Sequence, residues 1–330
     1  MIYTIAEIGG NHEGNFDVAK ELLNLACETE VNAVKFQIYY ADTLVNKVID
    51  EDRWNHFKKF ELTIEQHIEL AEQCKNNNKD YLASIWDKES FKVMAEYMPY
   101  IKIGSGDLNS GEFLRLAAST EKPIILSTGL ANISEINESI QYLRGLNPFY
   151  ENKQNIILLQ CTSMYPIDYG DANLNCMIEM ANRFRVVPGY SDHTIDSHAL
   201  EVAASIGAEF LEFHFTNDKK NTTFRDHKVS LDKNEVNKLI DRLKIINLVK
   251  GKKDKSPAEI EIKTGHTLSF RRTIYFSKNL KKGSKIDSSC LISQRPLTEP
   301  NGMLYDSFIG KKIVKDVLKG SPVKLNDLSD

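Results

Sequence analysis

Short apolar runs alternate with amphipathic stretches over residues 1–250 of the chain. The run at 1–8 is short enough for a strand, and 17–28 then carries apolar residues at helical spacing. This alternation continues to residue 248 and predicts eight strands and eight helices in succession. Eight strand–helix units over about 250 residues are the size of a (β/α)8 TIM barrel, so this α/β fold is the predicted class.

The predicted elements follow one another without a short repeat or a low-complexity block. We predict strands at 1–8, 32–37, 80–85, 100–103, 123–126, 156–160, 185–188 and 208–213. We predict helices at 17–28, 63–76, 89–97, 111–119, 134–143, 172–184, 197–206 and 232–248, with Ser134 as an N-cap. A long connection at 39–62 interrupts the pattern, and connections of that length are often lids or contact arms.

A charged, breaker-rich linker at 251–267 separates the barrel, 1–250, from a tail of different character. In this tail, 268–330, the pattern predicts short strands at 271–276 and 314–317. Roughly 60 residues make a small core. We therefore expect a β-rich second domain that packs on a barrel or on a partner subunit.

The composition mainly excludes certain kinds of partner and location. A net charge of −4 and a pI near 6.1 give no electrostatic reason to expect nucleic acid or an anionic membrane as a partner. No apolar run approaches the length of a membrane span, and the strand pattern begins at Met1 without a basic leader. The five cysteines contain no CxxC pair and are typical of reduced thiols, so we expect a cytoplasmic protein.

Two histidines follow consecutive predicted strands, within Gly189–Thr194 and Glu212–Thr216. In a barrel the carboxyl ends of all strands open into one mouth. His193 and His214 can therefore meet there as neutral ligands of one divalent ion. The alternative is that either histidine is a hydrogen-bonded core residue.

Other predicted strand ends carry groups that suit an anionic substrate. They are the lysines Lys35 and Lys102, the hydroxyls Ser84, Ser105, Ser127, Thr128 and Ser163, and the carboxylates Glu7, Asp107, Asp192 and Asp226. Lysines and hydroxyls bind anions, and carboxylates act as acids, bases or supporting partners. Such a mouth with one metal ion suits a small phosphorylated or carboxylated substrate that adds to a carbonyl.

A set of motifs in fixed order resembles the bacterial sialic acid synthases and, more broadly, the nonulosonic acid synthase family. The motifs are Ala6-Glu7-Ile8-Gly9-Gly10-Asn11-His12, Val34-Lys35-Phe36-Gln37, Lys102-Ile103-Gly104-Ser105-Gly106-Asp107, Leu126-Ser127-Thr128-Gly129, Cys161-Thr162-Ser163-Met164-Tyr165-Pro166, Gly189-Tyr190-Ser191-Asp192-His193-Thr194 and Asp226-His227-Lys228. Residues 270–327 resemble the antifreeze-like (SAF) domain of the same enzymes.

The resemblance implies condensation of phosphoenolpyruvate (PEP) with an N-acetylated hexosamine, which releases phosphate and gives a nine-carbon 2-keto acid. It implies that His193 and His214 hold Mn²⁺ or Mg²⁺ and that Glu7 acts as the base or transfers a proton. The implied catalytic set is Glu7, Asp107, His193 and His214, and the implied PEP-binding set is Lys35, Ser84, Lys102, Ser105 and Ser127. The implied sugar-binding set is Gln37, Ser163, Tyr165 and Asp226.

The family also implies a domain-swapped homodimer. In that dimer Arg295, just before Pro296, would enter the mouth of the neighbouring subunit, with Arg271 or Arg272 as the fallback.

Some positions depart from the usual family pattern. Asp107 stands where glutamate is common, and Trp86, within Ser84-Ile85-Trp86-Asp87, stands where phenylalanine is usual. Phe213 precedes the second histidine where lysine is frequent. The segment 163–168 is closer to relatives that make pseudaminic or legionaminic acid. The acceptor is thus either N-acetylmannosamine or a di-N-acetylated deoxy sugar.

Three other functions fit parts of the pattern. A Schiff-base lyase would use Lys102 or Lys35 as its nucleophile and would be indifferent to chelators. A non-catalytic carbohydrate-binding protein would have no turnover, so a change of His193 or His214 would alter none. Another PEP-condensing aldol synthase, such as a keto-sugar-acid phosphate synthase, is disfavoured by the small C-terminal domain.

Overall fold

The chain forms two compact units in a computed structural model that describes residues 2–220, 222 and 224–330. The first unit spans Met1–Gly251 and the second Lys252–Asp330. Each unit has its own cluster of buried apolar side chains.

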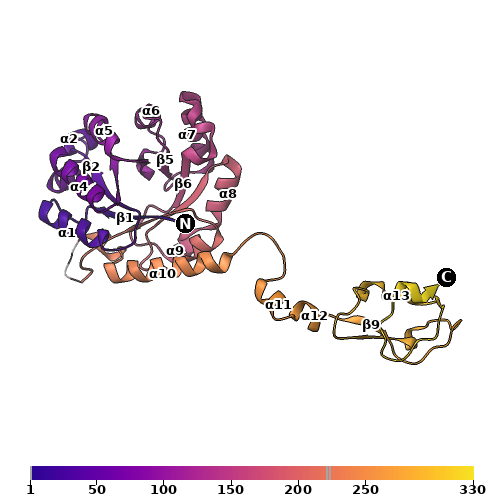
Figure 1. The fold of residues 1–330 in the computed structure, drawn as a ribbon. Coiled ribbons are helices and arrows are strands. Elements are labelled where there is room, and N and C mark those ends of the chain that lie inside the picture. Colours follow the sequence, from indigo (N-terminus) through magenta and orange to yellow (C-terminus); the bar gives the residue numbers. More distant parts are fainter. Residues whose placement is uncertain (1, 221, 223) are drawn as a thin grey trace. The chain divides into compact units, whose positions relative to one another are not determined.

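The first unit contains a closed barrel of parallel strands in the order β1 to β8 (Figure 1). The strands are β1 Tyr3–Gly9, β2 Ala33–Ile38, β3 Asp80–Ile85, β4 Ile101–Ile103, β5 Ile124–Ser127, β6 Ile156–Cys161, β7 Val187–Asp192 and β8 Phe210–His214. Strand β8 pairs back with β1, so the barrel has no free sheet edge. The predicted TIM barrel is confirmed.

Helices surround the strands in Figure 1. They are α1 Phe16–Cys27, α4 Ile64–Asn76, α5 Lys88–Met94, α6 Gly111–Ala118, α7 Ile133–Leu146, α8 Asn175–Phe184, α9 His198–Ile206 and α10 Lys233–Lys250. In α1 the buried residues Ala19, Leu22, Leu23 and Ala26 follow helical spacing, as expected for one face against the strands. Within the described ranges, no helix has the length and apolarity needed to cross a membrane.

Short 3₁₀ helices occupy several loops of both units. They are η1 Ala95–Tyr97, η2 Ser105–Asp107, η3 Pro148–Glu151, η4 Lys153–Asn155, η5 Tyr169–Ala172, η6 Arg225–Lys228, η7 Ser288–Cys290, η8 Gly302–Leu304 and η9 Leu325–Asp327. Two of them, η2 and η6, carry residues of the cavity described below.

The long connection at 39–62 is more ordered than the sequence pattern indicated. It contains two helices, α2 Ala41–Leu44 and α3 Glu51–Phe60. The side chain of Asp50 caps α3 by accepting a hydrogen bond from the backbone N–H of Arg53 at 3.0 Å. The charges of α3 hide its few apolar positions, so the periodicity alone did not predict this helix.

Helix α7 begins one residue earlier than predicted, because Asn132 and not Ser134 is its N-cap. The Asn132 side chain accepts from the backbone N–H groups of Ser134 at 2.8 Å and Glu135 at 3.2 Å. Glu135 in turn accepts from the backbone N–H of Asn132 at 2.8 Å, which completes a capping box. The predicted cap at Ser134 is wrong.

Strand β7 runs four residues beyond the predicted end at Pro188, through Asp192. The extension pairs with β6 and β8 although Gly189 and Asp192 are poor strand formers. Glycine fits position 189 without displacing its neighbours, since a Cβ there would lie 2.3 Å from Cδ2 of Leu159 and 3.0 Å from the backbone oxygen of Phe210. The longer strand carries His193 into the barrel mouth.

The second unit is built from two short antiparallel pairs and small helices. Strand β9 Thr273–Phe276 pairs with β10 Leu291–Gln294, and β11 Lys312–Ile313 pairs with β12 Leu328–Ser329. The helices are α11 Glu259–Lys263, α12 His266–Ser269 and α13 Tyr305–Phe308. The strand predicted at 314–317 lies instead at 312–313, and Val317 makes an isolated bridge to Leu280.

Candidate active site

A cavity of about 980 Å³ opens at the carboxyl ends of the barrel strands. It is lined by every site residue that the sequence predicted in the first unit: Glu7, Lys35, Gln37, Ser84, Lys102, Ser105, Asp107, Ser127, Ser163, Tyr165, His193, His214 and Asp226. Arg295 belongs to the second unit, where it is exposed and its guanidinium lies 4.9 Å from the centre of the Phe270 ring. The cavity thus gathers the predicted catalytic and substrate-binding residues of the first unit, whereas Thr128 and Asp192 are not among the described residues that line it.

The strand register explains why these side chains meet. Glu7 on β1 lies beside Lys35 on β2 and, on its other side, beside His214 on β8. Ser84 on β3 likewise lies beside Lys102 on β4. Residues in register on neighbouring parallel strands point the same way, which here is into the barrel mouth.

Two lysines and two glutamates form a buried floor network at the inner end of the cavity. Lys102 Nζ lies 2.8 Å from Glu212 Oε1 and 3.0 Å from Oε2, and it donates to Ser127 Oγ at 2.8 Å. Lys35 Nζ lies 2.7 Å from Glu7 Oε2 and 3.8 Å from Glu212 Oε2. Each buried charge has an opposite partner, which offsets the cost of removing it from water.

Glu212 is a member of this network that the sequence analysis did not single out. The available signal was a glutamate inside the apolar run 208–213, two residues before His214. Period two places both side chains on one face of the strand. Burial opposes its ionisation, but the charges of Lys102 and Lys35 outweigh burial and lower the pKa of Glu212 to about 2.

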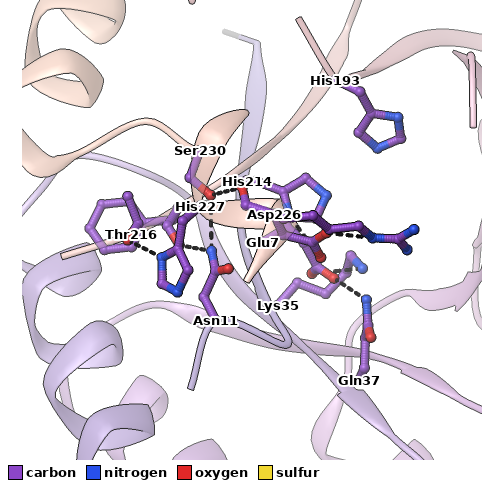
Figure 2. A network of polar contacts seen from close by, with 12 residues as sticks. Glu7, Asn11, Lys35, Gln37, His193, His214, Thr216, Asp226, His227 and Ser230 are labelled. Atoms are coloured by element: carbon purple, nitrogen blue, oxygen red, sulfur yellow. Dashed lines mark hydrogen bonds and ion pairs between the residues drawn. The ribbon is translucent and has the colours of Figure 1, made fainter. Parts of the chain in front are cut away.

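Glu7 has a different protonation behaviour in the same network. Burial raises the pKa of Glu7 to about 7, although the charge of Lys35 acts in the opposite direction. Its Oε1 accepts a hydrogen bond from Gln37 Nε2 at 3.1 Å, and Figure 2 shows the carboxylate between Lys35 and Gln37. Near neutral pH this carboxylate can therefore take up or release a proton.

The two predicted histidines lie close together in the barrel mouth. Their ring centroids are 5.4 Å apart with an interplanar angle of 50°. His193 Nδ1 lies 2.7 Å from the carbonyl oxygen of Thr162, so Nδ1 carries the proton and Nε2 keeps its lone pair. His214 Nδ1 is buried without a hydrogen-bond partner in the described chain, and Asp226 Oδ2 lies 4.0 Å away (Figure 2).

Both histidines are suited to hold a divalent metal ion. Burial lowers the pKa of His193 and of His214 to about 3, so both imidazoles are neutral at pH 7. Neutral imidazole nitrogens are good ligands for divalent transition metals. In the part of the chain that the structure describes, no cluster of three or more histidine, cysteine or carboxylate side chains surrounds one point. Water or substrate would have to complete the coordination of such an ion.

An aromatic and cationic wall adjoins the histidines. The ring centroids of Tyr165 and His193 lie 4.0 Å apart. The guanidinium of Arg225 lies 4.9 Å from the centre of the same Tyr165 ring. Arg225 Nε also donates to Asp226 Oδ1 at 3.3 Å. Sequence reasoning missed Arg225, although it directly precedes the predicted Asp226.

Asp107 is held by the unusual tryptophan of this sequence. The indole Nε1–H of Trp86 donates to Asp107 Oδ2, and both residues line the cavity. Burial raises the pKa of Asp107. The two departures from the family pattern are therefore in direct contact.

Two of the predicted serines accept hydrogen bonds from the lysines, Ser84 from Lys35 and Ser127 from Lys102. Lys35 Nζ donates to Ser84 Oγ at 3.4 Å, and Ser105 Oγ accepts from the backbone N–H of Gly129 at 3.1 Å. A Cβ on residue 129 would lie 2.7 Å from Ser105 Oγ, so only glycine allows this approach.

Two other strand-end candidates serve the fold. Thr128 Oγ1 donates to the carbonyl oxygen of Leu159 at 2.9 Å. Asp192 accepts from the backbone N–H of Thr194 and from the hydroxyl of Tyr190, both at 2.9 Å. These bonds fix the strand ends that present Ser127 and His193.

A second polar network supports the loop that carries Asp226 (Figure 2). Asn11 Nδ2 donates to the carbonyl oxygen of Phe215 at 2.8 Å and to Ser230 Oγ at 2.9 Å. Ser230 Oγ in turn donates to the backbone carbonyl of Asp226 at 2.7 Å. Asn11, two residues after the end of β1, thereby helps to position Asp226 beside His214.

The relatives found by comparison with known proteins agree with one another. A family model described as the NeuB family matches residues 22–255. The chain is 31% identical to the N,N′-diacetyllegionaminic acid synthase of Legionella pneumophila, over 97% of this chain and 92% of that protein. It is 33% identical to the N,N′-diacetyllegionaminic acid synthase of Campylobacter jejuni, over 94% of this chain and 96% of that protein.

A solved structure agrees with these matches. The crystal structure of N-acetylneuraminic acid (sialic acid) synthetase from Leptospira borgpetersenii, in complex with citrate, superposes with a TM-score of 0.74 at 27% identity. The match covers 80% of this chain and 90% of that one. The fold, the cavity and the family match agree with the resemblance stated from the sequence: this chain belongs to the NeuB family.

Proposed function

We propose that this protein condenses PEP with an N-acetylated amino sugar, giving a nonulosonic acid and phosphate. One observation carries the proposal. A single cavity holds two buried lysines, each bonded to a serine, together with a pair of neutral histidines. The lysine side suits a small dianionic or trianionic substrate, and the histidine side suits a carbonyl to be activated.

The reaction balances as follows. C3 of PEP attacks the aldehyde carbon of the open-chain sugar and forms the new C–C bond. Water adds at C2 of PEP, and cleavage of the C–O bond releases phosphate. Lys35 and Lys102, with Ser84, Ser105 and Ser127, would bind the PEP phosphate and carboxylate. Glu7 would exchange the proton, because its pKa of about 7 lets it change charge near neutrality.

His193 and His214 would hold a divalent cation, Mn²⁺ or Mg²⁺, which when bound supplies a Lewis acid for the sugar aldehyde. The orphaned Nδ1 of His214 and the free Nε2 of His193 support this assignment. Gln37, Ser163, Tyr165 and Asp226 would contact the sugar from the surrounding strand ends. Asp107, held by Trp86, would complete the catalytic set.

The second unit has a proposed role of its own. We propose that it is an SAF domain and that a domain-swapped homodimer brings its Arg295 into the partner's cavity. Arg295 is exposed in the second unit, where its guanidinium lies over the Phe270 ring.

The Schiff-base alternative is disfavoured by the floor network. A nucleophilic lysine needs a free lone pair. Lys102 instead lies within 3.0 Å of both carboxylate oxygens of Glu212, which favours its cation although burial lowers its pKa, and Lys35 lies 2.7 Å from Glu7.

Phosphate release from PEP tests the proposal. The full-length protein would be assayed with Mn²⁺ and either N-acetylmannosamine or a di-N-acetylated deoxy sugar, with EDTA as the control. Sugar-dependent release that EDTA abolishes is expected. Absence of release with every sugar, or trapping of a carbonyl substrate by borohydride, would contradict the synthase assignment.

A further inference from the structure

Arg225 is a cavity residue that neither the sequence pattern nor the family resemblance singled out. It belongs to η6 and lines the cavity together with Asp226, the next residue in the chain. Its side chain is 69% exposed. Its guanidinium nevertheless contacts two of the residues that the proposed function places around the acceptor sugar, Tyr165 and Asp226.

The first contact occupies one oxygen of the Asp226 carboxylate. Arg225 Nε donates to Asp226 Oδ1 at 3.3 Å. The other oxygen, Oδ2, lies 4.0 Å from His214 Nδ1, which is too far for a hydrogen bond. Within the described ranges no other group donates to Oδ2. This oxygen is therefore left to accept a hydrogen bond from a ligand in the cavity.

The second contact holds the ring of Tyr165. The guanidinium of Arg225 lies 4.9 Å from the centre of that ring, within the range of a cation–π interaction. The centroid of the same ring lies 4.0 Å from that of His193 and 5.5 Å from that of His214. The arginine thus packs on the tyrosine that adjoins both candidate metal ligands.

The chain is held in place on both sides of Arg225. The ring of Phe224 packs against that of Phe60, with centroids 5.0 Å apart, and it also lies close to Gly10, where a Cβ would be 3.0 Å from the ring. On the other side, the carbonyl oxygen of Asp226 accepts from Ser230 Oγ at 2.7 Å. The guanidinium therefore extends from an anchored segment.

These two contacts contribute little to the stability of the fold. Ion pairs of exposed side chains stabilise proteins only weakly. Small displacements of groups that contact a substrate, in contrast, have large effects on its binding and reaction. Arg225 is thus placed to affect the site more than the fold.

We propose that Arg225 is a positioning residue for the acceptor sugar, an inference that rests on the proposed function. By holding Oδ1 of Asp226 and the ring of Tyr165, it presents Oδ2 of Asp226 to a hydroxyl group of the sugar. The two lysines that would bind PEP pair with other carboxylates. Loss of the guanidinium should therefore weaken the binding of the sugar and spare that of PEP.

The kinetics of phosphate release by Arg225→Met test the inference in the full-length protein. The assay contains PEP, Mn²⁺ and whichever acceptor, N-acetylmannosamine or a di-N-acetylated deoxy sugar, gives the faster release with the unmodified protein. We expect KM for the sugar to rise about tenfold, and KM for PEP to change by less than about twofold. The melting temperature should change by less than about 2 °C. Arg225→Lys keeps the charge without the planar fork, so its KM for the sugar should be intermediate.

A double variant tests whether Arg225 acts through Asp226. Asp226→Asn removes the negative charge that the guanidinium holds. In that background Arg225→Met should raise KM for the sugar by less than about threefold, because the contact is already weakened. A further tenfold rise would show that Arg225 acts independently of Asp226 and would overturn the positioning role.

Arg115→Met is the matched control. The guanidinium of Arg115 also lies over a tyrosine ring, 5.8 Å from the centre of Tyr142, and neither residue is among the described residues that line the cavity. An unchanged KM for the sugar in Arg225→Met, an equal rise of both Michaelis constants, or the same effect from Arg115→Met overturns the inference and leaves the proposed function intact. No release by the unmodified protein with either sugar overturns both.

Discussion

His214 tests the site at the scale of one residue. It is buried, neutral and without a hydrogen-bond partner at Nδ1 in the described chain, so its replacement leaves no unpaired polar atom behind. We expect His214→Ala to lower kcat by roughly 100-fold or more while the protein stays folded. His198→Ala is the control, because that side chain is 69% exposed and is paired with Asp196 outside the cavity lining of the described residues. Activity near that of the unmodified protein would contradict the metal assignment.

The pair of Trp86 and Asp107 gives a prediction of coupling. Trp86→Phe removes the donor that holds the Asp107 carboxylate and should lower kcat/KM about tenfold. Adding Asp107→Glu to that variant lengthens the acid by one methylene, so the carboxylate reaches further without the indole. We expect the double variant to recover most of the activity and each single variant to lose it. Additive losses in kcat/KM would show that the two positions act independently.

The sequence predicted which residues meet in the barrel mouth where they lie at or near a strand end, and their chemical roles stay predictions. Glu7, Lys35, Lys102 and the two histidines follow apolar runs, and the barrel brings such positions together. Glu212 was missed because the sequence does not indicate which residues pair with a charged side chain inside an apolar strand. Its partner Lys102 lies on another strand, 110 residues away in the sequence.

At the scale of elements, strand and helix order was predictable and several boundaries were not. Period-two and helical patterns can be recognised in the sequence. The exact ends of strands and helices depend instead on strand pairing and on helix capping. Strand β7 continues past Pro188 because its neighbours supply hydrogen bonds to Gly189–Asp192. Helix α3 was missed because charged residues outnumber its apolar positions.

The cap of α7 gives an element-scale prediction. Asn132→Ala should lower the free energy of unfolding by about 1 kcal/mol, because two backbone N–H groups lose their acceptor. Ser134→Ala is the matched control and should change stability by less than about 0.5 kcal/mol, since its hydroxyl makes one exposed contact to Glu138. Urea denaturation of both variants measures the difference. A larger effect at Ser134 would reverse the assignment of the cap.

At the scale of the whole molecule, the sequence separated two units but did not define their geometry. The barrel and the second unit each have a core, and the chain divides after Gly251. The sequence around an exposed arginine such as Arg295 does not indicate which site its side chain binds. Its role therefore stays a prediction that only an assembly can test.

Mixed dimers test whether Arg295 acts across subunits. Arg295→Ala should raise KM for the sugar about tenfold and leave KM for PEP unchanged. Mixing it with His214→Ala subunits should then restore activity at low sugar concentration, where both parents are weak, because one barrel in each hybrid receives both intact residues. Failure of refolded or co-expressed hybrids to recover activity would place Arg295 in its own subunit or outside the site. Arg183→Ala, on the outside of α8, serves as the control in the same assay.

The floor network has a consequence for proton balance. Glu7 and Glu212 already neutralise Lys35 and Lys102 before any anion enters. PEP would bring further negative charge beside Glu7 and raise its pKa above the value of about 7 in the free protein. Binding of PEP should therefore take a proton from solution, and the affinity for PEP should fall as the pH rises above about 7. Titration calorimetry in two buffers of different ionisation enthalpy would detect this uptake, and Glu7→Gln should abolish it.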